Sequence, residues 1–340
     1  MIRFALIVAS TLGFFLTAAM GNLMVPLLRS LQSRNRPAQT QQAPGPDRPE
    51  NADPEPERPA QPPTMGGLCL MVGVLAAVGV GWTAACVAEP QLLGAEGLLS
   101  TRLLIALFGA LLFGGVGLAD DIARIRRRSP LGLRRGTRLL LEAGAGAVVL
   151  VLLGANGCLA GGMALPGAGY VGLGVLAPLL WEAELVALAE SVRITDEMDG
   201  LCCGTAFAAM LGLMLCMTVL GWFPLAVLPA ALAGALMAFL LWNFPPAKLR
   251  LGSVGSLFLA GALGCIPLCI GYAELSVPLA LPFWAAGGLW AAQLLGAKRT
   301  GKPLRCWVKK HKMSPETVFL CSFALSAVGY VLALALLRWC

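Results

Sequence analysis

Four aspartates are the residues of this sequence most suited to chemistry. Outside the Pro-rich stretch 36–63 the chain has no other aspartate, and the four fall into two short motifs. GLADD contains Asp120 and Asp121, with arginines following directly, and TDEMDG contains Asp196 and Asp199. Hard cations such as Mg²⁺ bind carboxylate and phosphate oxygens together. The motifs therefore suit a site for a metal ion and a phosphorylated ligand; the alternative is that these aspartates only cap helices or pair with the arginines.

A Gly-rich turn is a third candidate part of this site. Residues 242–256 read WNFPPAKLRLGSVGS, with Asn243 ahead of a Pro-Pro break and with Gly252, Gly255 and Ser256 where the next helix should begin. Successive backbone N–H groups at a helix N-terminus bind anions. Glycine also occurs where membrane helices simply begin, so the turn alone is weak support for a phosphate site.

The segments that must position these motifs are too apolar for a water-soluble protein. The chain is 58% hydrophobic and 13% charged, which excludes soluble nucleic-acid binders, secreted disulfide scaffolds and soluble Rossmann-type enzymes. Apolar runs of about 18–24 residues have the length that spans ~30 Å of hydrocarbon as a helix. We therefore predict an all-α integral membrane protein with about ten transmembrane helices, at roughly 4–27, 66–88, 101–119, 139–156, 169–189, 201–220, 223–242, 254–272, 276–296 and 316–338.

The distribution of cations predicts the orientation. Of the 25 Lys and Arg residues, 22 lie in alternate connections, whereas the intervening connections hold none. By the positive-inside rule the basic connections face the cytoplasm, which places both termini outside and the aspartates on the cytoplasmic face. The first apolar run is interpreted as an uncleaved span, with a signal peptide as the alternative. The basic connections are 29–64, 120–138, 190–200, 243–253 and 298–313.

The chain is predicted to form a single polytopic membrane domain over residues 1–340. Residues 36–63 are rich in Pro, Gln and Glu without apolar periodicity, which predicts a disordered cytoplasmic loop. The eleven cysteines are scattered, mostly within apolar runs and without a CxxC pair. They are interpreted as small buried hydrophobic residues, so no disulfide framework is expected.

Several short stretches, in a common order, resemble motifs of a known enzyme family. The sequence resembles the polyprenyl-phosphate sugar-1-phosphate transferases of the glycosyltransferase 4 family, and most closely the phospho-N-acetylmuramoyl-pentapeptide transferases. Arg138 stands at a lysine of one family motif, and Glu142 stands at a glutamine. The stretches are PTMGG (63–67), GLADD (117–121), GLRRGTRLLLE (132–142), TDEMDGL (195–201), WNFPPAKLRLGSVGS (242–256) and TGK (300–302).

The resemblance implies an enzyme of the bacterial cytoplasmic membrane that acts in cell-wall synthesis. Its substrates would be a UDP-sugar and undecaprenyl phosphate, and its cofactor Mg²⁺, with Mn²⁺ as the alternative. The lipid phosphate attacks the β-phosphate of the donor and releases UMP, after Asp120 or Asp121 has taken its proton. Asp196 and Asp199 help to hold metal and nucleotide, with Asp120, Asp121 and Asp199 as metal ligands. Family precedent also implies a homodimer, and no nucleic-acid partner is expected.

The resemblance also implies a set of substrate-contacting residues. Asn243 would contact the nucleotide side of the pocket. The remaining members come from the cytoplasmic connections and from the start of the helix after the Gly-rich turn. The set is Arg138, Asn243, Gly252, Gly255, Ser256 and His311.

Departures from the family pattern concern the charges of the site. Ser253 stands where the family has an aspartate that is a principal metal ligand, and a neutral hydroxyl cannot replace that anionic donor at equal affinity. Glu190 and Arg193 stand at two family asparagines, and Glu197 stands at a glycine. The family's cytoplasmic cluster of three histidines is absent, because His311 is the only histidine of the chain.

Two alignments are open for the histidine cluster: His311 aligns with its first histidine, or residues 305–307 occupy that place. Two hypotheses about function also remain. In the first, the chain is an active transferase with altered metal use, in which Glu190 or Glu197 replaces the lost carboxylate. The alternative is a non-catalytic paralogue that binds polyprenyl phosphate or regulates the pathway.

Overall fold

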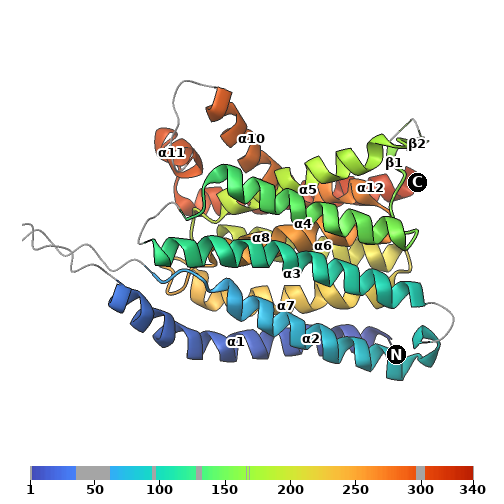
Figure 1. Ribbon diagram of the computed structural model, residues 1–340, viewed down its shortest axis with the longest axis horizontal. Helices are drawn as coiled ribbons and strands as arrows, with labels where there is room; N and C mark the ends of the chain where they lie inside the picture. The colour runs from blue at the N-terminus through green and yellow to red at the C-terminus, as the bar shows by residue number, and fades with distance from the viewer. Residues whose placement is uncertain are drawn as a thin grey trace, which may run out of the picture.

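The computed structural model describes residues 2–35, 62–93, 97–127, 132–165, 167, 169–295 and 303–339. The predicted disordered loop lies outside them except for its last two residues. The described chain is almost entirely helical (Figure 1). Its α-helices are α1 (Ile2–Asn35), α2 (Gly67–Ala88), α3 (Gly97–Arg126), α4 (Arg135–Ala155), α5 (Leu176–Thr195), α6 (Leu201–Val219), α7 (Val227–Asn243), α8 (Gly252–Ile270), α9 (Ser276–Leu279), α10 (Leu281–Leu295), α11 (Pro303–Lys310) and α12 (Pro315–Trp339).

The short elements connect the long helices. The strands β1 (Gly162–Leu165) and β2 (Gly169–Gly172) form an antiparallel hairpin between α4 and α5, with Met163 opposite Val171. The single turns η1 (Pro90–Leu93), η2 (Phe223–Ala226) and η3 (Ala273–Leu275) follow α2, α6 and α8.

The prediction of an all-α membrane protein is confirmed. Within the described residues, eight helices are long and apolar enough to cross a membrane. Large apolar side chains lie exposed along the outer faces of the long helices, among them Phe15, Leu104, Val151 and Val331. Such surfaces are expected where a helix contacts lipid instead of water.

Two predicted spans differ from the structure. The span expected at 169–189 begins instead as strand β2, and its helix α5 runs from Leu176 to Thr195. The span expected at 276–296 is divided at Ala280 into α9 and α10. Pro282 lies in the first turn of α10, where a proline without an N–H is tolerated and a new helix can begin.

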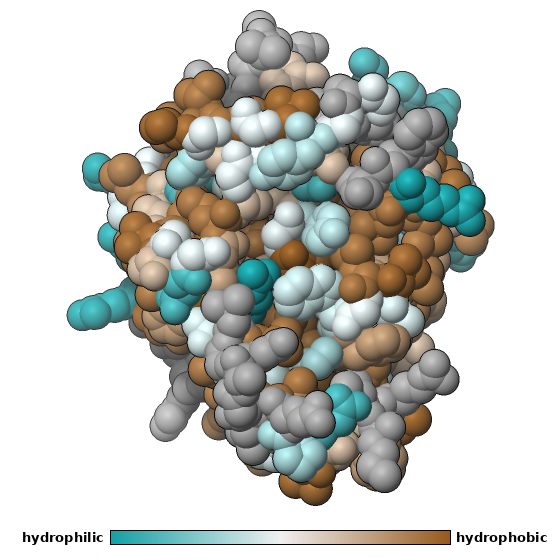
Figure 2. Space-filling model, turned by 90° about the vertical axis from the view of Figure 1, so that its right-hand side faces the viewer, coloured by the Kyte–Doolittle hydropathy of each residue, from teal (hydrophilic) through white to brown (hydrophobic). Residues whose placement is uncertain are grey.

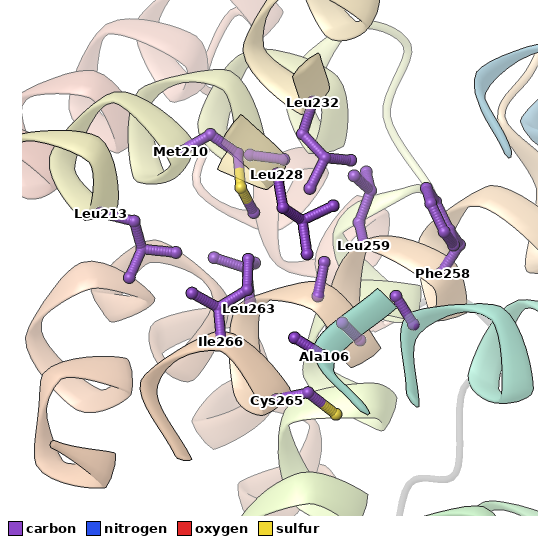
Figure 3. Close-up of a cluster of buried hydrophobic side chains, with 14 of the residues drawn as sticks. Ala106, Met210, Leu213, Leu228, Leu232, Phe258, Leu259, Leu263, Cys265 and Ile266 are labelled. Carbon is purple, nitrogen blue, oxygen red and sulfur yellow. The ribbon is translucent and has the colours of Figure 1, made fainter. Parts of the chain in front are cut away.

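The long helices lie side by side as a bundle around α8 (Figure 1). Every residue of α8 is buried, and its side chains meet those of α3, α6 and α7 in a common apolar core (Figure 3). Figure 3 labels Ala106 from α3, Met210 from α6, Leu232 from α7 and Ile266 from α8 among these residues. Because α8 contacts other helices on all sides, its N-terminal end is held in a fixed position.

Helix direction gathers the polar motifs at one end of the bundle. The ends of α3, α5 and α7 and the beginning of α8 lie at the left in Figure 1, and both chain termini lie at the opposite end. Figure 2 shows the end with the termini, where hydrophilic and hydrophobic residues are intermingled over the surface. Asp120, Asp196, Asn243 and Ser253 therefore belong to the same end of the molecule, although up to 133 residues separate them in sequence.

Candidate active site

A close contact between two helices positions the first aspartate pair. A Cβ on Gly117 of α3 would overlap the carbonyl group of Ser253 at the beginning of α8. Glycine therefore lets the two helices approach closely at this level. Asp120 and Asp121 follow on the same helix and are both buried, at 0% and 1% exposure. The approach brings their carboxylates against the first turn of α8.

The carboxylate of Asp120 accepts hydrogen bonds from three parts of the chain. Oδ1 accepts from the backbone N–H of Leu133, with N and O 2.8 Å apart. Oδ2 accepts from the Oγ hydroxyl of Ser253 at 2.7 Å and from Nη2 of Arg124 at 3.0 Å. A buried carboxylate needs such partners to remain charged.

The carboxylate of Asp121 is tied to the N-terminus of α8. Its Oδ2 accepts from the backbone N–H of Val254 at 3.1 Å, which satisfies one of the free donors of the first helical turn. Its Oδ1 accepts from Nη1 of Arg124 at 3.1 Å. Each oxygen of Asp121 thus accepts one of these bonds, whereas Oδ2 of Asp120 accepts two.

The second aspartate motif lies in the turn after α5. Nη2 of Arg250 donates to the backbone carbonyl of Asp196 at 2.6 Å, and its Nε lies 3.7 Å from Oδ1 of Asp199. Burial raises the pKa of the Asp196 carboxyl to about 7, while Arg250 opposes the rise and the charge of Asp121 adds to it. The two acidic motifs therefore interact electrostatically, and Arg250 supplies one neutralising charge.

Asn243 connects the loops that carry these groups. Its side chain is 2% exposed. Oδ1 accepts from the backbone N–H of Gly200 at 2.9 Å, and Nδ2 donates to the carbonyl of Leu249 at 3.0 Å. The amide thereby holds the TDEMDG turn against the loop before α8, and its expected contact with the nucleotide stays a prediction.

Residues of the Gly-rich turn have different surroundings. Gly252 has a φ of +75°, and a Cβ there would lie 2.7 Å from Oδ2 of Asp121, so only glycine fits without strain. Gly255 packs against Gly67 of the PTMGG segment. The Oγ of Ser256, which is fully buried, donates to the carbonyl of Gly252 at 3.0 Å. Of the three, Gly252 alone touches an aspartate of the site.

A buried ion cluster lies beside the aspartates. Oε1 of Glu190 accepts from Nε and Nη2 of Arg138 at 3.0 and 2.8 Å, and its Oε2 accepts from Nη2 of Arg193 at 2.8 Å. Glu142, which is fully buried, lies 3.5 Å from Nε of Arg138 and has no hydrogen-bond partner within the described residues. Arg138 is 5% exposed, so its guanidinium holds this cluster together, and its contact with substrate stays a prediction.

Glu197, which stands at a glycine of the family pattern, binds the short helix α11 at the same end of the bundle. The Oε2 of Glu197 accepts from the backbone N–H groups of Leu304 and Arg305 at 3.1 and 3.3 Å. His311 follows α11, is exposed, and has its ring 4.7 Å from that of Trp307. Glu190 is bound by two arginines and Glu197 by α11, and replacement of the carboxylate lost at position 253 by either of them stays a prediction.

The carboxylates of the site have the chemistry that a divalent cation prefers. Asp120, Asp121, Asp196 and Asp199 offer hard oxygen donors at one end of the bundle. Within the described residues, no three His, Cys, Asp or Glu side chains already lie at metal-binding spacing. The guanidinium of Arg124 lies between the first two carboxylates instead. The chemistry of the donor set fits a divalent cation, and its role as a metal site stays a prediction.

Pairing with the following arginines was the alternative expected for the aspartates from the sequence, and Arg124 does pair with Asp120 and Asp121. Nothing in the sequence identified Arg250 as the partner of Asp199. For Arg124 a signal was available, since it follows Asp121 by three residues and Asp120 by four, which places all three on one face of a helix. Arg250 carried no local signal, because Asp199 lies in a different loop.

Comparison of the sequence with those of known proteins identifies the family. Residues 103–271, which include both acidic motifs and Ser253, match the model of glycosyl transferase family 4. A phospho-N-acetylmuramoyl-pentapeptide-transferase of Mycobacterium bovis is 30% identical over 265 residues, covering 71% of this chain and 72% of the relative. Proteins of the same name from Acaryochloris marina and Lactiplantibacillus plantarum are 32% and 30% identical, covering 77% and 66% of this chain and 62% and 65% of the relatives. The chain therefore belongs to glycosyl transferase family 4, within its phospho-N-acetylmuramoyl-pentapeptide-transferase branch.

Proposed function

We propose that this protein transfers phospho-N-acetylmuramoyl-pentapeptide from a UDP-linked donor to undecaprenyl phosphate, releasing UMP. The observation that carries this proposal is the buried Asp120–Asp121 pair, set against the N-terminus of α8 in a chain related to transferases of that name. The protein is a multi-pass membrane protein, and we place it in the bacterial inner membrane with the site facing the cytoplasm, where the basic connections lie.

In the reaction, an oxygen of the lipid phosphate attacks the β-phosphorus of the donor. A new P–O bond forms, the bond between the β-phosphorus and the bridging oxygen breaks, and UMP leaves with that oxygen. Asp120 or Asp121 takes the proton of the lipid phosphate, since both carboxylates are buried and lie against the beginning of α8. The neighbouring aspartate is the metal-binding or phosphate-orienting partner.

The family is generally metal-dependent. We propose Mg²⁺, or Mn²⁺ in its place, held by Asp120, Asp121 and Asp199; when bound it neutralises charge that develops on the transferred phosphate. Arg250 lies beside Asp199 and stabilises the turn while the anionic donor binds. Asp196 acts with Asp199 on the nucleotide side. His311, Gly252, Gly255 and Ser256 remain proposed substrate contacts.

The test is release of UMP by protein purified in detergent, supplied with undecaprenyl phosphate and UDP-N-acetylmuramoyl-pentapeptide. UDP-N-acetylglucosamine is supplied in parallel, and Asp121→Asn is the control. Turnover with the pentapeptide donor that the substitution abolishes supports the proposal. No turnover with either donor, in protein that still binds the lipid, favours the non-catalytic paralogue, which the relatives do not favour. The mass of the protein–detergent complex checks the homodimer expected from the family.

A further inference from the structure

Arg124 forms a closed ring of contacts with the groups expected to hold the metal. Its Nη1 lies 3.1 Å from Oδ1 of Asp121, and its Nη2 lies 3.0 Å from Oδ2 of Asp120 and 3.2 Å from Oγ of Ser253. The hydroxyl of Ser253 in turn donates to Oδ2 of Asp120 at 2.7 Å. One guanidinium thus contacts both carboxylates and the hydroxyl at once.

The side chains of this ring differ in exposure, and the difference indicates which of them can leave when a metal ion binds. The aspartate side chains are 0% exposed, whereas that of Arg124 is 28% exposed. The aspartates are fixed by Leu133, Val254 and Ser253 and cannot turn away. Arg124 has a long flexible stem that reaches solvent. If another cation enters this ring, Arg124 is the group that leaves.

Ser253 makes the ring possible. A hydroxyl can accept from Arg124 and donate to Asp120 in the same arrangement, as it does here. The ring therefore contains two carboxylates and one guanidinium, where a carboxylate at position 253 would give three anions around the same space. Three anions require a cation of higher charge than a single guanidinium supplies.

We propose that Arg124 is a built-in competitor of the divalent cation, occupying the position between Asp120 and Asp121 and leaving it when the metal binds. This inference rests on the proposed function only for the use of a metal. The donor pyrophosphate offers Arg124 another anionic partner, since arginine binds phosphate through two parallel hydrogen bonds. The metal and the donor therefore bind with positive cooperativity, and each increases the affinity of the protein for the other by the same factor.

The test is direct titration of Mn²⁺ into the full-length protein in detergent, without lipid or donor, with free Mn²⁺ measured by electron paramagnetic resonance. Arg124→Gln removes the competing charge and both ion pairs. We expect the Kd for Mn²⁺ to fall about tenfold, because two ion pairs, buried on the aspartate side and partly exposed on the arginine side, no longer have to be broken. Arg126→Gln, a charge-matched change at an exposed position of the same helix end, should alter the Kd less than twofold.

The response to nucleotide gives a second readout. Adding UDP should tighten Mn²⁺ binding in the wild type more than in Arg124→Gln, because the variant has no guanidinium to transfer. An unchanged or higher Kd in Arg124→Gln overturns the inference and makes Arg124 an organiser of the aspartates. If Arg124→Gln melts at a much lower temperature than the wild type, Arg124→Lys is measured instead. The ammonium group of lysine is a point charge that cannot contact both carboxylates at once, so the Kd for Mn²⁺ should fall in this variant too. An unchanged Kd in Arg124→Lys overturns the inference.

Binding of Mn²⁺ is measured without turnover, so the two proposals can fail separately. If the wild type releases no UMP but Arg124→Gln binds Mn²⁺ more tightly than the wild type, the proposed function is contradicted and the competition is supported. If the wild type releases UMP but Arg124→Gln does not change the affinity for Mn²⁺, the proposed function is supported and the competition is contradicted.

Discussion

Replacing Glu190 by glutamine tests the buried ion cluster beside the site. Glu190 accepts two hydrogen bonds from Arg138 and one from Arg193, all between 2.8 and 3.0 Å, and its side chain is 5% exposed. The glutamine keeps the shape but removes the charge, which leaves two largely buried guanidinium groups without the carboxylate that binds them both. Removing one member of a buried ion pair costs about 3–5 kcal/mol.

The expected result is a large loss of stability in Glu190→Gln. A cost of about 3 kcal/mol lowers the folding equilibrium constant by roughly two orders of magnitude. Reversible unfolding of the detergent-solubilised protein with sodium dodecyl sulfate, followed by tryptophan fluorescence, measures the change. Glu316→Gln is the matched control, because Glu316 is exposed in the first turn of α12.

A double-mutant cycle separates this interaction from other effects of the substitution. Arg138→Gln combined with Glu190→Gln should cost less than the sum of the single changes, because each single change leaves a buried charge without its partner. The reasoning is refuted if Glu190→Gln unfolds within about 1 kcal/mol of the wild type, since a water-accessible pair would contribute no more than that.

Three further outcomes are expected. Glu197→Ala removes the acceptor for two N–H groups of α11 and should cost about 0.5–2 kcal/mol of local stability, seen as faster hydrogen exchange in α11 but not in α3. Because the pKa of Asp196 is raised, the folded chain keeps a proton that the unfolded chain releases near pH 4. As the pH rises from about 4 to 8 in metal-free buffer, the melting temperature of the wild type should therefore fall relative to that of Asp196→Asn. Asn243→Ala leaves Gly200 N–H and Leu249 C=O without their partner and should lower stability by about 1–3 kcal/mol, measured by thermal unfolding.

The fold could be predicted because the bilayer reduces the choice of structures. Long Leu-, Ala- and Gly-rich runs leave little besides helices, so the predicted runs agree with most of the long helices to within several residues. One exception is the run 276–296, which is divided into α9 and α10. The other is α5, which begins at Leu176 instead of at the predicted residue 169. Residues 169–172 are apolar like the helix after them, and their pairing with 162–165 in a hairpin depends on a turn that hydropathy does not reveal.

The site could be predicted in residue type but not in its pairings. The aspartates were recognisable because only four lie outside residues 36–63 and these fall near the ends of apolar runs. The partner of Asp120 at Ser253 is 133 residues away, and it follows from the close approach of α3 and α8 at Gly117. The sequence did not reveal that the amide of Asn243 joins two loops, and its expected contact with the nucleotide stays a prediction.

Substitution of a charged residue in such a site has to be judged with its neighbours. Taken alone, Ser253 removes an anion and should weaken the attraction for a cation. In the structure, the same serine accepts a hydrogen bond from Arg124 and donates one to Asp120, so the two remaining carboxylates stay paired and buried without an additional charge. A carboxylate restored by Ser253→Asp would instead meet the Asp120 carboxylate at hydrogen-bonding distance. Restoring the family residue therefore increases repulsion unless a divalent cation enters, and the thermal stability of Ser253→Asp should depend more steeply on added Mn²⁺ than that of the wild type.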